Sequence, residues 1–363
     1  MMSLAHSALI MAAGTGGHIM PGLAIAQELA VRGWRTQWLG TAHGMENTLV
    51  PKAGIVLNRL QFAGLRGKGV LGALKGAWQL LGAVLDSLRL LRRIKPSVVV
   101  GMGGYVCVPG AWAARLLGVP VVLVNADADV LLSNRSLARF AKAVCCGFAG
   151  SAALLKNAVL TGNPVRSAVA AIAPPPLRYS GDGLSLNILV VGGSLGAQVL
   201  NETVPAALGL LPDKRHVNVV HQAGAKHLAA VQAAYAHQQL NATVLPFIDD
   251  MAAQYAWAHV VVCRAGAITV SELCAAGVPA ILVPFLASTT HHQAGNAAYL
   301  ATAGAGVHLP QSQLSPQALV DALQALSPAA LLAMAQAAKS LGKPQATRHV
   351  ADIIEQHSLK PAL

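Results

Sequence analysis

The stretch that decides the fold is residues 260–277, which read VVVCRAGAITVSELCAAG. Its first four residues are apolar and mostly β-branched, which predicts a short buried strand over 260–263. Residues 264–266 predict a tight turn. Residues 267–276 suit a helix, and Gly277 with a proline shortly after it would end that helix. We therefore expect a strand, a glycine turn and a helix in immediate succession.

The start of this helix is suited to bind phosphate. The first N–H groups of a helix have no partner within it, and the helix dipole adds partial positive charge there. Glu272 follows about a turn and a half into the helix, where a carboxylate can accept hydrogen bonds from two neighbouring hydroxyls such as those of a ribose. The alternative is an ordinary strand–turn–helix in which Glu272 is merely solvated.

The same pattern recurs along the chain, which favours the phosphate interpretation. Further glycine turns follow expected strands at GTGGH (14–18), GMGGY (101–105) and GGSLGA (192–197). The expected strands are residues 8–12, 36–40, 98–100, 119–124, 187–191, 217–222, 242–246, 260–263 and 280–283. Helices are expected over 21–31, 70–94, from 198, over 225–237 and through most of 316–356.

Two successive arrays of this kind, joined by the proline-rich residues 174–183, predict an α/β protein with two Rossmann-like domains. We expect an N-terminal domain over 1–163 and a C-terminal domain over 164–340. We expect residues 341–363 to form a C-terminal helix that packs back on the N-terminal domain.

Composition narrows the class of protein. No stretch reaches about 20 uninterrupted apolar residues, so we expect no transmembrane helix. The N-terminus lacks a basic region and runs into a glycine turn, which indicates a first strand rather than a signal peptide. The five cysteines include no C-x-x-C pair, which favours reduced thiols over a disulfide or zinc framework. His291 and His292 are adjacent, a poor spacing for a shared metal, and we expect neither a metal nor a cofactor.

The net charge of +12 is unevenly distributed. Residues 1–163 contain 16 Lys and Arg against 5 Asp and Glu, whereas the remainder contains 10 against 9. The N-terminal half should therefore meet an anionic partner: a nucleic acid, an acidic lipid surface or a phosphorylated substrate.

The expected helix over residues 70–94 favours a lipid surface. An apolar stripe repeats along it at helical spacing, and basic residues flank the stripe. The stripe is Leu71, Leu74, Trp78, Leu81, Leu85 and Leu88, and the basic flank is Lys68, Lys75, Arg89, Arg92, Arg93 and Lys95. The alternative is a core-packed helix with a solvated basic end. Nucleic acid is disfavoured, because the basic residues lie beside an apolar stripe rather than among stacking aromatics.

Two residues are candidates for acid–base chemistry. His18 ends the first glycine turn near a helix N-terminus, whose dipole lowers an imidazole pKa and keeps the ring neutral, as a general base requires. Asp127 follows the expected strand over 119–124, and such strand ends are where open α/β sheets bind ligands. The alternatives are a loop-capping histidine and ordinary turn chemistry for the aspartate. The first turn is not a dinucleotide fingerprint, because the third glycine of G-x-G-x-x-G would fall at Ile19.

With GTGGHIMPG, GMGGY, TGNPVR, GGSLGA, PFIDDM and CRAGAITVSE in this order, the chain resembles the MurG family, enzymes of glycosyltransferase family 28. The resemblance implies a GT-B fold, with two Rossmann-like parallel-sheet domains facing a central cleft. It implies inverting transfer of N-acetylglucosamine (GlcNAc) from UDP-GlcNAc to lipid I, giving lipid II and UDP in peptidoglycan synthesis. The C-terminal domain would bind the donor and the basic N-terminal domain lipid I, peripherally at the cytoplasmic face of the inner membrane.

The resemblance also implies the residues of the site. For catalysis it indicates His18, with Asp127 as a second acid–base group. The expected UDP-GlcNAc contacts of the N-terminal domain are Thr15, Gly16, Gly17 and Asp127. Arg166 and Ser194 are expected to contact the diphosphate, and Ile248 the uracil through its backbone. The expected contacts with the phosphates and ribose are Ala267, Ile268, Thr269, Val270, Ser271 and Glu272, and those with the sugar hydroxyls are Gln293 and Asn296. The expected acceptor and membrane side comprises Gly103, Gly104, Tyr105, Arg66, Lys68, Lys75 and Trp78.

Departures from the family pattern leave alternatives open. Ala13 stands where the family has a glycine, and residues 124–127 (VNAD) stand where it often has H-E-Q-N, so a histidine and a glutamate are absent. The alternatives are another UDP-sugar glycosyltransferase of GT-B fold, a UDP-sugar epimerase, an NAD-linked dehydrogenase, and a non-catalytic nucleotide- or lipid-binding scaffold. Other wall-synthesis proteins are possible partners.

Overall fold

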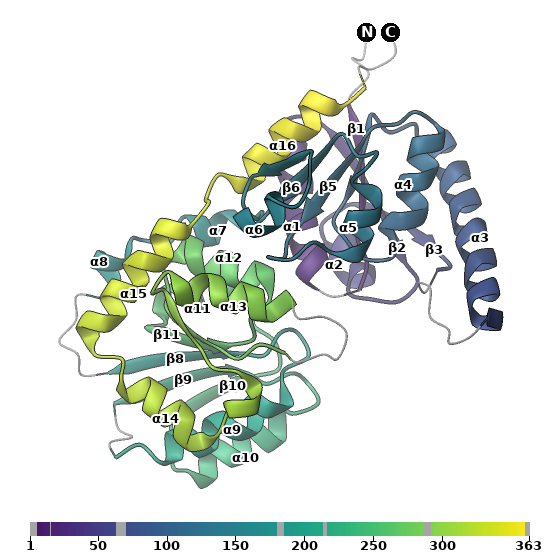
Figure 1. Ribbon diagram of the computed structural model, residues 1–363. Coiled ribbons are helices and arrows are strands. Elements are labelled where there is room, and N and C mark those ends of the chain that lie inside the picture. Colours follow the sequence, from purple (N-terminus) through teal and green to yellow (C-terminus); the bar gives the residue numbers. More distant parts are fainter. Residues whose placement is uncertain are drawn as a thin grey trace. The chain divides into compact units, whose positions relative to one another are not determined.

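The computed structural model describes residues 6–14, 16–62, 70–179, 185–212, 216–285 and 292–359. For residues 70–75 it describes the backbone alone. The chain divides into two compact units (Figure 1). The first consists of Met1–Val165 together with Gln345–Leu363, and the second of Arg166–Pro344. The division falls two residues after the expected boundary, and Arg166 belongs to the second part of the chain in both cases.

The first unit is built on a parallel seven-stranded sheet in the order β3-β2-β1-β4-β5-β6-β7. Its strands are β1 (Ser7–Met11), β2 (Arg35–Thr41), β3 (Val56–Leu60), β4 (Val98–Gly101), β5 (Val121–Asn125), β6 (Ala143–Cys146) and β7 (Ala158–Leu160). Its helices are α1 (Gly16–Val31), α2 (Glu46–Lys52), α3 (Val70–Ile94), α4 (Cys107–Leu116), α5 (Leu132–Leu137), α6 (Ala149–Ala152) and α16 (Ala346–His357).

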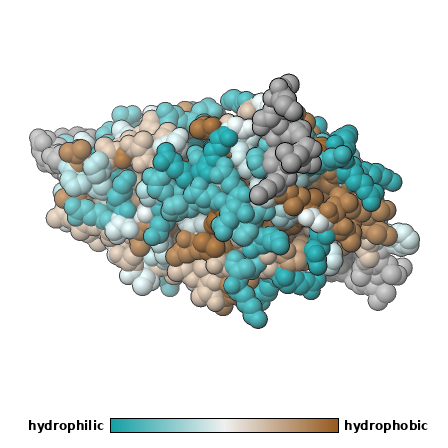
Figure 2. All heavy atoms as spheres, turned by 90° about the horizontal axis from the view of Figure 1, so that it is seen from above, coloured by the Kyte–Doolittle hydropathy of each residue, from teal (hydrophilic) through white to brown (hydrophobic). Residues whose placement is uncertain are grey.

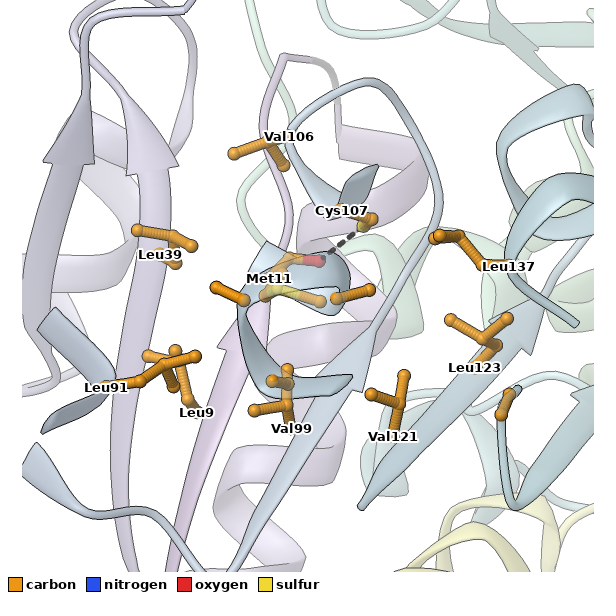
Figure 3. Packing of buried hydrophobic residues seen from close by; sticks show 14 of the residues in the cluster. Leu9, Met11, Leu39, Leu91, Val99, Val106, Cys107, Val121, Leu123 and Leu137 are labelled. Carbon is orange, nitrogen blue, oxygen red and sulfur yellow. Dashed lines mark hydrogen bonds between the residues drawn. The ribbon is translucent and has the colours of Figure 1, made fainter. Parts of the chain in front are cut away.

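Both faces of this sheet are buried, which explains why its central strands read as continuous apolar runs. Leu9 and Met11 of β1 point to the face that α3 and α4 cover, and Figure 3 shows them packed with Leu39, Val99 and Leu123 of neighbouring strands. The Cys107 thiol at the start of α4 donates a hydrogen bond to the Met11 carbonyl at 3.3 Å. The alternate residues of β1 pack on the opposite face with α1 and α16.

The second unit contains a parallel six-stranded sheet in the order β10-β9-β8-β11-β12-β13. Its strands are β8 (Leu186–Val191), β9 (Val217–Gln222), β10 (Ala242–Leu245), β11 (Val260–Cys263), β12 (Ala280–Leu282) and β13 (Gly306–His308). Its helices are α7 (Ser167–Ala170), α8 (Pro175–Arg178), α9 (Gln198–Gly209), α10 (Leu228–His237), α11 (Met251–Trp257), α12 (Ala267–Ala276), α13 (His292–Thr302), the 3-10 turn η1 (Gln311–Gln313), α14 (Pro316–Gln324) and α15 (Pro328–Leu341).

The C-terminal helix α16 is anchored to α1 by charge as well as by apolar contacts. Arg32, just after α1, donates to Asp352 at 2.7 Å and to Glu355 at 2.8 Å. The Trp34 indole N–H donates to the other oxygen of Glu355 at 3.1 Å. Because α16 also buries Ile354 with its neighbours on the sheet face that α1 covers, the end of the chain completes the core of the first unit.

The first helix begins earlier than the sequence suggests. We expected it from Pro21, but α1 starts at Gly16 and contains Pro21. A proline at the sixth position of a helix removes a single hydrogen bond, to the carbonyl of Gly17, and the remaining turns continue. His18 therefore lies in the first turn of the helix rather than in the loop before it.

Candidate functional site

Each sheet has one switch point, where the strand order reverses. In the second unit it lies between β8 and β11, the two central strands, since successive strands run outward from each in opposite directions. Ligands of open α/β sheets bind beyond the carboxyl ends of the strands at such a point. The 192–197 turn follows β8 and the start of α12 follows β11, so both lie at this place in the second unit.

Among the described residues, no side chain caps the start of helix α12, and the helix ends sharply. Its N-cap, Gly266, offers no side chain to bind the first amides. At the other end Gly277 adopts φ +67° and ψ +59°, the left-handed conformation that ends a helix at low cost only with glycine. The observed bounds of β11 and α12 confirm the strand and helix expected from residues 260–277.

Glu272 is buried and ion-paired rather than solvated. It is 5% exposed, and its two oxygens accept hydrogen bonds from Arg166 Nε at 2.8 Å and Arg166 Nη2 at 2.9 Å. The Tyr255 hydroxyl, also buried, donates to Glu272 Oε2 at 3.3 Å. Burial and the neighbouring Glu272 charge raise the pKa of Tyr255, so the phenol stays protonated and remains a donor. The interpretation of Glu272 as a merely solvated residue is therefore wrong.

This pairing joins two of the expected donor contacts to one another. Burial lowers the pKa of Arg166, but the hydrogen bond to Glu272 and the negative charge of Glu272 outweigh burial. The pKa of Arg166 is therefore raised. Arg166 keeps 29% of its side chain exposed, whereas Glu272 keeps 6%. The guanidinium therefore has further N–H groups with which to meet an anion, while the carboxylate is largely occupied.

Two other expected donor residues support backbone in this structure. Asn296 is fully buried and donates from its amide to the carbonyl of Ala265, in the turn before α12, at 3.0 Å. Gln293 accepts a hydrogen bond from the Phe285 N–H at 2.8 Å. The amides thus hold the turn before α12 and the segment after β12, and their expected role with sugar hydroxyls stays a prediction.

The 192–197 turn carries Ser194, which is partly exposed. The turn is supported by Gln222 at the end of β9, whose amide donates to the Gly193 carbonyl at 2.7 Å. The other side of the same amide accepts from the Ile248 N–H at 2.8 Å. Gln222 was not identified as a site residue from the sequence. Only its position at the end of a strand could have indicated it.

In the first unit the switch point lies between β1 and β4, and His18 lies there. Its ring packs against the glycine turn after β4: a Cβ added to Gly103 would lie 3.1 Å from His18 Nε2, and one added to Gly104 would lie 3.9 Å from Nδ1. Burial lowers the pKa of His18, and the negative charge of Asp127 raises it by less. The imidazole is therefore neutral at neutral pH, in the form that accepts a proton.

The Asp127 loop is built around a buried asparagine. The Asn125 amide donates to the carbonyls of Asp127 at 2.9 Å and Asp129 at 3.0 Å, and its oxygen accepts from the Leu131 N–H at 3.1 Å. Asn134 donates to that oxygen at 3.1 Å. Asn125 stands at the second position of the family's H-E-Q-N, and here it shapes the loop that brings the Asp127 charge near His18.

Glu46 is a second residue that the sequence did not single out. It is fully buried, and its carboxylate accepts from the Gly14 N–H at 3.0 Å and the Thr41 N–H at 3.1 Å. A Cβ on Gly44 would lie 2.3 Å from Glu46 Oε2, so the glycine makes room for the carboxylate. Glu46 thereby holds the start of the first glycine turn, in which Gly16 and Gly17 are described and Thr15 lies outside the described residues.

An exposed apolar surface covers part of α3 and α4. Trp78, Leu81 and Leu85 of α3 are 74%, 49% and 45% exposed, and Leu116 and Trp112 of α4 are 65% and 38% exposed. Figure 2 shows hydrophobic residues gathered at its right-hand end, where α3 and α4 lie in Figure 1. We call these five residues the α3–α4 patch.

The two interpretations of α3 apply to different faces. Ala83, Leu90 and Leu91 are buried against the sheet, whereas the three α3 residues of the patch are not, so the core-packed alternative is wrong for those three. Leu88 is partly buried against the core. Arg66 and Lys68, and the side chains of Leu71, Leu74 and Lys75, lie outside the described residues. Tyr105, beyond β4, is 36% exposed.

Within the described ranges, no group of three or more His, Cys, Asp or Glu residues is arranged to hold a metal ion. In the same ranges no single helix is long and apolar enough to cross a membrane. One bent pair, Pro316–Gln324 with Pro328–His357, meets that test jointly by length and composition alone.

Two parallel α/β units, each with glycine turns at its switch point, make this a protein of GT-B fold. The model of the glycosyltransferase family 28 N-terminal domain matches residues 8–146, and that of the family 28 C-terminal domain matches residues 187–356. The chain belongs to glycosyltransferase family 28.

Curated relatives match almost end to end. The UDP-N-acetylglucosamine--N-acetylmuramyl-(pentapeptide) pyrophosphoryl-undecaprenol N-acetylglucosamine transferase of Chromobacterium violaceum is 54% identical, over 97% of this chain and 98% of the relative. The enzyme of the same name from Methylibium petroleiphilum is 53% identical over 98% of each. Among solved structures, Acinetobacter baumannii MurG has a TM-score of 0.82 and 38% identity, covering 97% of this chain and 99% of that one.

Proposed function

We propose that this protein transfers GlcNAc from UDP-GlcNAc to the C4 hydroxyl of the N-acetylmuramyl (MurNAc) sugar of lipid I, producing lipid II and UDP. The observation that carries the proposal is the identity of 53–54% with transferases of that name over nearly the whole of both chains. A UDP-GlcNAc 2-epimerase from Neisseria meningitidis shares the fold, with a TM-score of 0.66, but only 13% of the sequence. The epimerase alternative therefore rests on fold alone.

The donor diphosphate would lie at the start of α12. The uncapped amides of residues 267–269 supply N–H donors, and the helix dipole favours negative charge there. Ser194 and the exposed part of Arg166 add donors from the same unit. The expected donor contacts at Thr15, Gly16 and Gly17 stay predictions from the sequence. Glu272 is the proposed ribose contact, and its pairing with Arg166 orients the carboxylate before any ligand arrives.

The reaction would be a single displacement at the anomeric carbon. The acceptor oxygen forms a bond to that carbon from the face opposite the diphosphate, and the bond to the phosphate oxygen breaks, so the configuration inverts. The hydroxyl proton passes to His18, which burial keeps neutral. The electron pair leaves with UDP, whose added charge the α12 amides and Arg166 stabilise. Asp127 would stabilise the protonated imidazole through its charge.

The acceptor carries a polyprenyl chain, and the α3–α4 patch fits a membrane surface. Exposed tryptophans and leucines supply apolar area, and Arg139, whose guanidinium lies 5.7 Å from the centre of the Trp112 ring, supplies positive charge beside it. The excess of basic residues in the first 163 positions favours anionic lipid. We propose peripheral binding at the cytoplasmic face of the plasma membrane, with Gly103, Gly104 and Tyr105 on the acceptor side.

The transfer itself is tested with UDP-GlcNAc labelled in the sugar. We expect label in the lipid fraction when a lipid I analogue is present, with UDP released in equal amount. Without the acceptor we expect the donor to stay intact. Conversion of the donor into its 2-epimer without acceptor would favour the epimerase, and binding of UDP without any turnover would favour the scaffold.

Membrane binding gives a separate prediction. The double change Trp78→Glu with Leu81→Glu places two charges on the patch and should lower the affinity for phosphatidylglycerol vesicles at least about tenfold, because two apolar anchors are lost. Co-sedimentation with vesicles measures this. Leu177→Glu is the matched control, since Leu177 is 71% exposed but lies in the second unit. Equal binding of the double variant and the control would contradict the membrane assignment of the patch.

A further inference from the structure

Gln222 joins three segments of the second unit that are far apart in sequence. It is 4% exposed at the end of β9, donates to the Gly193 carbonyl after β8, and accepts from the Ile248 N–H after β10. These strands are neighbours in the sheet and end at the same edge. A single side chain thus ties the glycine turn at the switch point to the loop beyond the edge strand.

The chemistry of this link requires an amide. A backbone carbonyl needs a donor and a backbone N–H needs an acceptor, and the glutamine side chain offers one of each. A glutamate of the same shape could still accept from Ile248, but its second oxygen would face the Gly193 carbonyl, which now lies 2.7 Å from the amide nitrogen. Two acceptors at that distance repel, so the isosteric change breaks one half of the link and keeps the other.

The backbone around Gln222 leaves the linked loops little freedom. A Cβ on Gly196 would lie 1.9 Å from the Ala223 carbonyl oxygen, and one on Gly224 would lie 2.2 Å from that of Leu195. The 192–197 turn therefore rests directly on the residues that follow Gln222. Asn201 of α9 adds a hydrogen bond to the Ala223 carbonyl at 3.0 Å.

We infer that Gln222 is a positioning residue for the selection of uracil. The inference rests on the proposed function and on the sequence prediction that Ile248 contacts uracil through its backbone. Because Gln222 occupies the Ile248 N–H, the group that Ile248 presents to a base is its carbonyl oxygen, an acceptor. The N3–H of uracil is a donor that matches it, whereas the N3 of cytosine is an acceptor that does not.

The test is the preference for UDP over CDP, measured by titration calorimetry on the full chain. The unchanged protein should bind UDP more tightly. In Gln222→Glu the ratio of the two dissociation constants should fall about tenfold, since the Ile248 loop loses its fixed position. Asn187→Ala is the matched control: it removes an amide hydrogen bond to the Trp257 carbonyl at 3.1 Å, at the start of β8. That variant should lose stability and keep the ratio.

Each result decides something different. A Gln222→Glu protein that binds UDP with the unchanged ratio would overturn the role of Gln222 and leave the proposed function standing. An unchanged protein without preference for UDP would overturn the donor assignment itself. If Gln222→Glu does not fold, Gln222→Ala removes the link without adding charge. UDP methylated at N3 tests the unchanged chain directly, and binding as tight as that of UDP would contradict an Ile248 carbonyl contact.

Discussion

Replacing Arg166 with alanine should lower the free energy of unfolding by about 3 kcal/mol and weaken UDP binding at least about tenfold. The reason is that Glu272 keeps only 6% of its side chain exposed and accepts two of its hydrogen bonds from Arg166. Without the guanidinium, a buried negative charge remains beside Tyr255 with one weak partner. The same change removes a donor from the proposed diphosphate site.

Urea unfolding and UDP titration measure the two effects separately. The matched control is Arg89→Ala, which removes an ion pair to Asp86 whose partners are 75% and 52% exposed, and which should cost less than about 0.5 kcal/mol. A double variant, Arg166→Met with Glu272→Leu, should regain most of the stability but not the binding. An Arg166→Ala protein as stable as the Arg89 control would contradict the buried pair, and one that binds UDP normally would contradict the donor site.

Replacing His18 with glutamine should lower kcat about a hundredfold or more while UDP binding changes little. The imidazole must be neutral to accept the proton, and burial lowers its pKa below the ordinary value of 6.5. In the unchanged enzyme, activity should therefore persist through pH 6.5 and fall only at lower pH, as the ring becomes protonated. The charge of Asp127 raises the pKa of His18, so Asp127→Asn should move the fall in activity to still lower pH.

The profile of kcat/KM against pH provides the measurement. Gly104 lies beside the His18 ring, and a Cβ added to it would be 3.9 Å from Nδ1. It is not a suitable control, because at its φ of +82° any other residue would strain the backbone. His43 is exposed in the loop after β2, and His43→Gln should leave the profile unchanged. An acid limb that is the same in the His18 variant as in the unchanged enzyme would show that another group accepts the proton.

The organisation of the chain follows from its sequence because the decisive patterns are local. A β-branched run, a glycine and a helix-forming stretch act within about 18 residues, and for residues 260–277 the expected and observed bounds agree. The strands that were missed, β3, β6, β7 and β13, are short or lie toward the sheet edges. Residues of β3 and β7 are largely solvent-accessible, so they lack a continuous apolar run.

The partners of the site residues could not be predicted in the same way. Arg166 and Glu272 are 106 residues apart, and their pairing depends on where α7 and α12 meet. Glu46 meets Gly14 across 32 residues, and Gln222 meets Ile248 across 26. In each case the residue type permits many partners, and only the folded backbone selects one. The sequence therefore indicated where ligands bind more readily than which side chains support the binding loops.

The most direct measurement is a crystal structure of the second unit's site with UDP-GlcNAc bound to the full chain. We predict that the diphosphate oxygens accept hydrogen bonds from the backbone N–H groups at the start of α12, with Arg166 beside them and Glu272 on the ribose. A bound donor that leaves those N–H groups empty, or that places its ribose away from Glu272, would contradict this account.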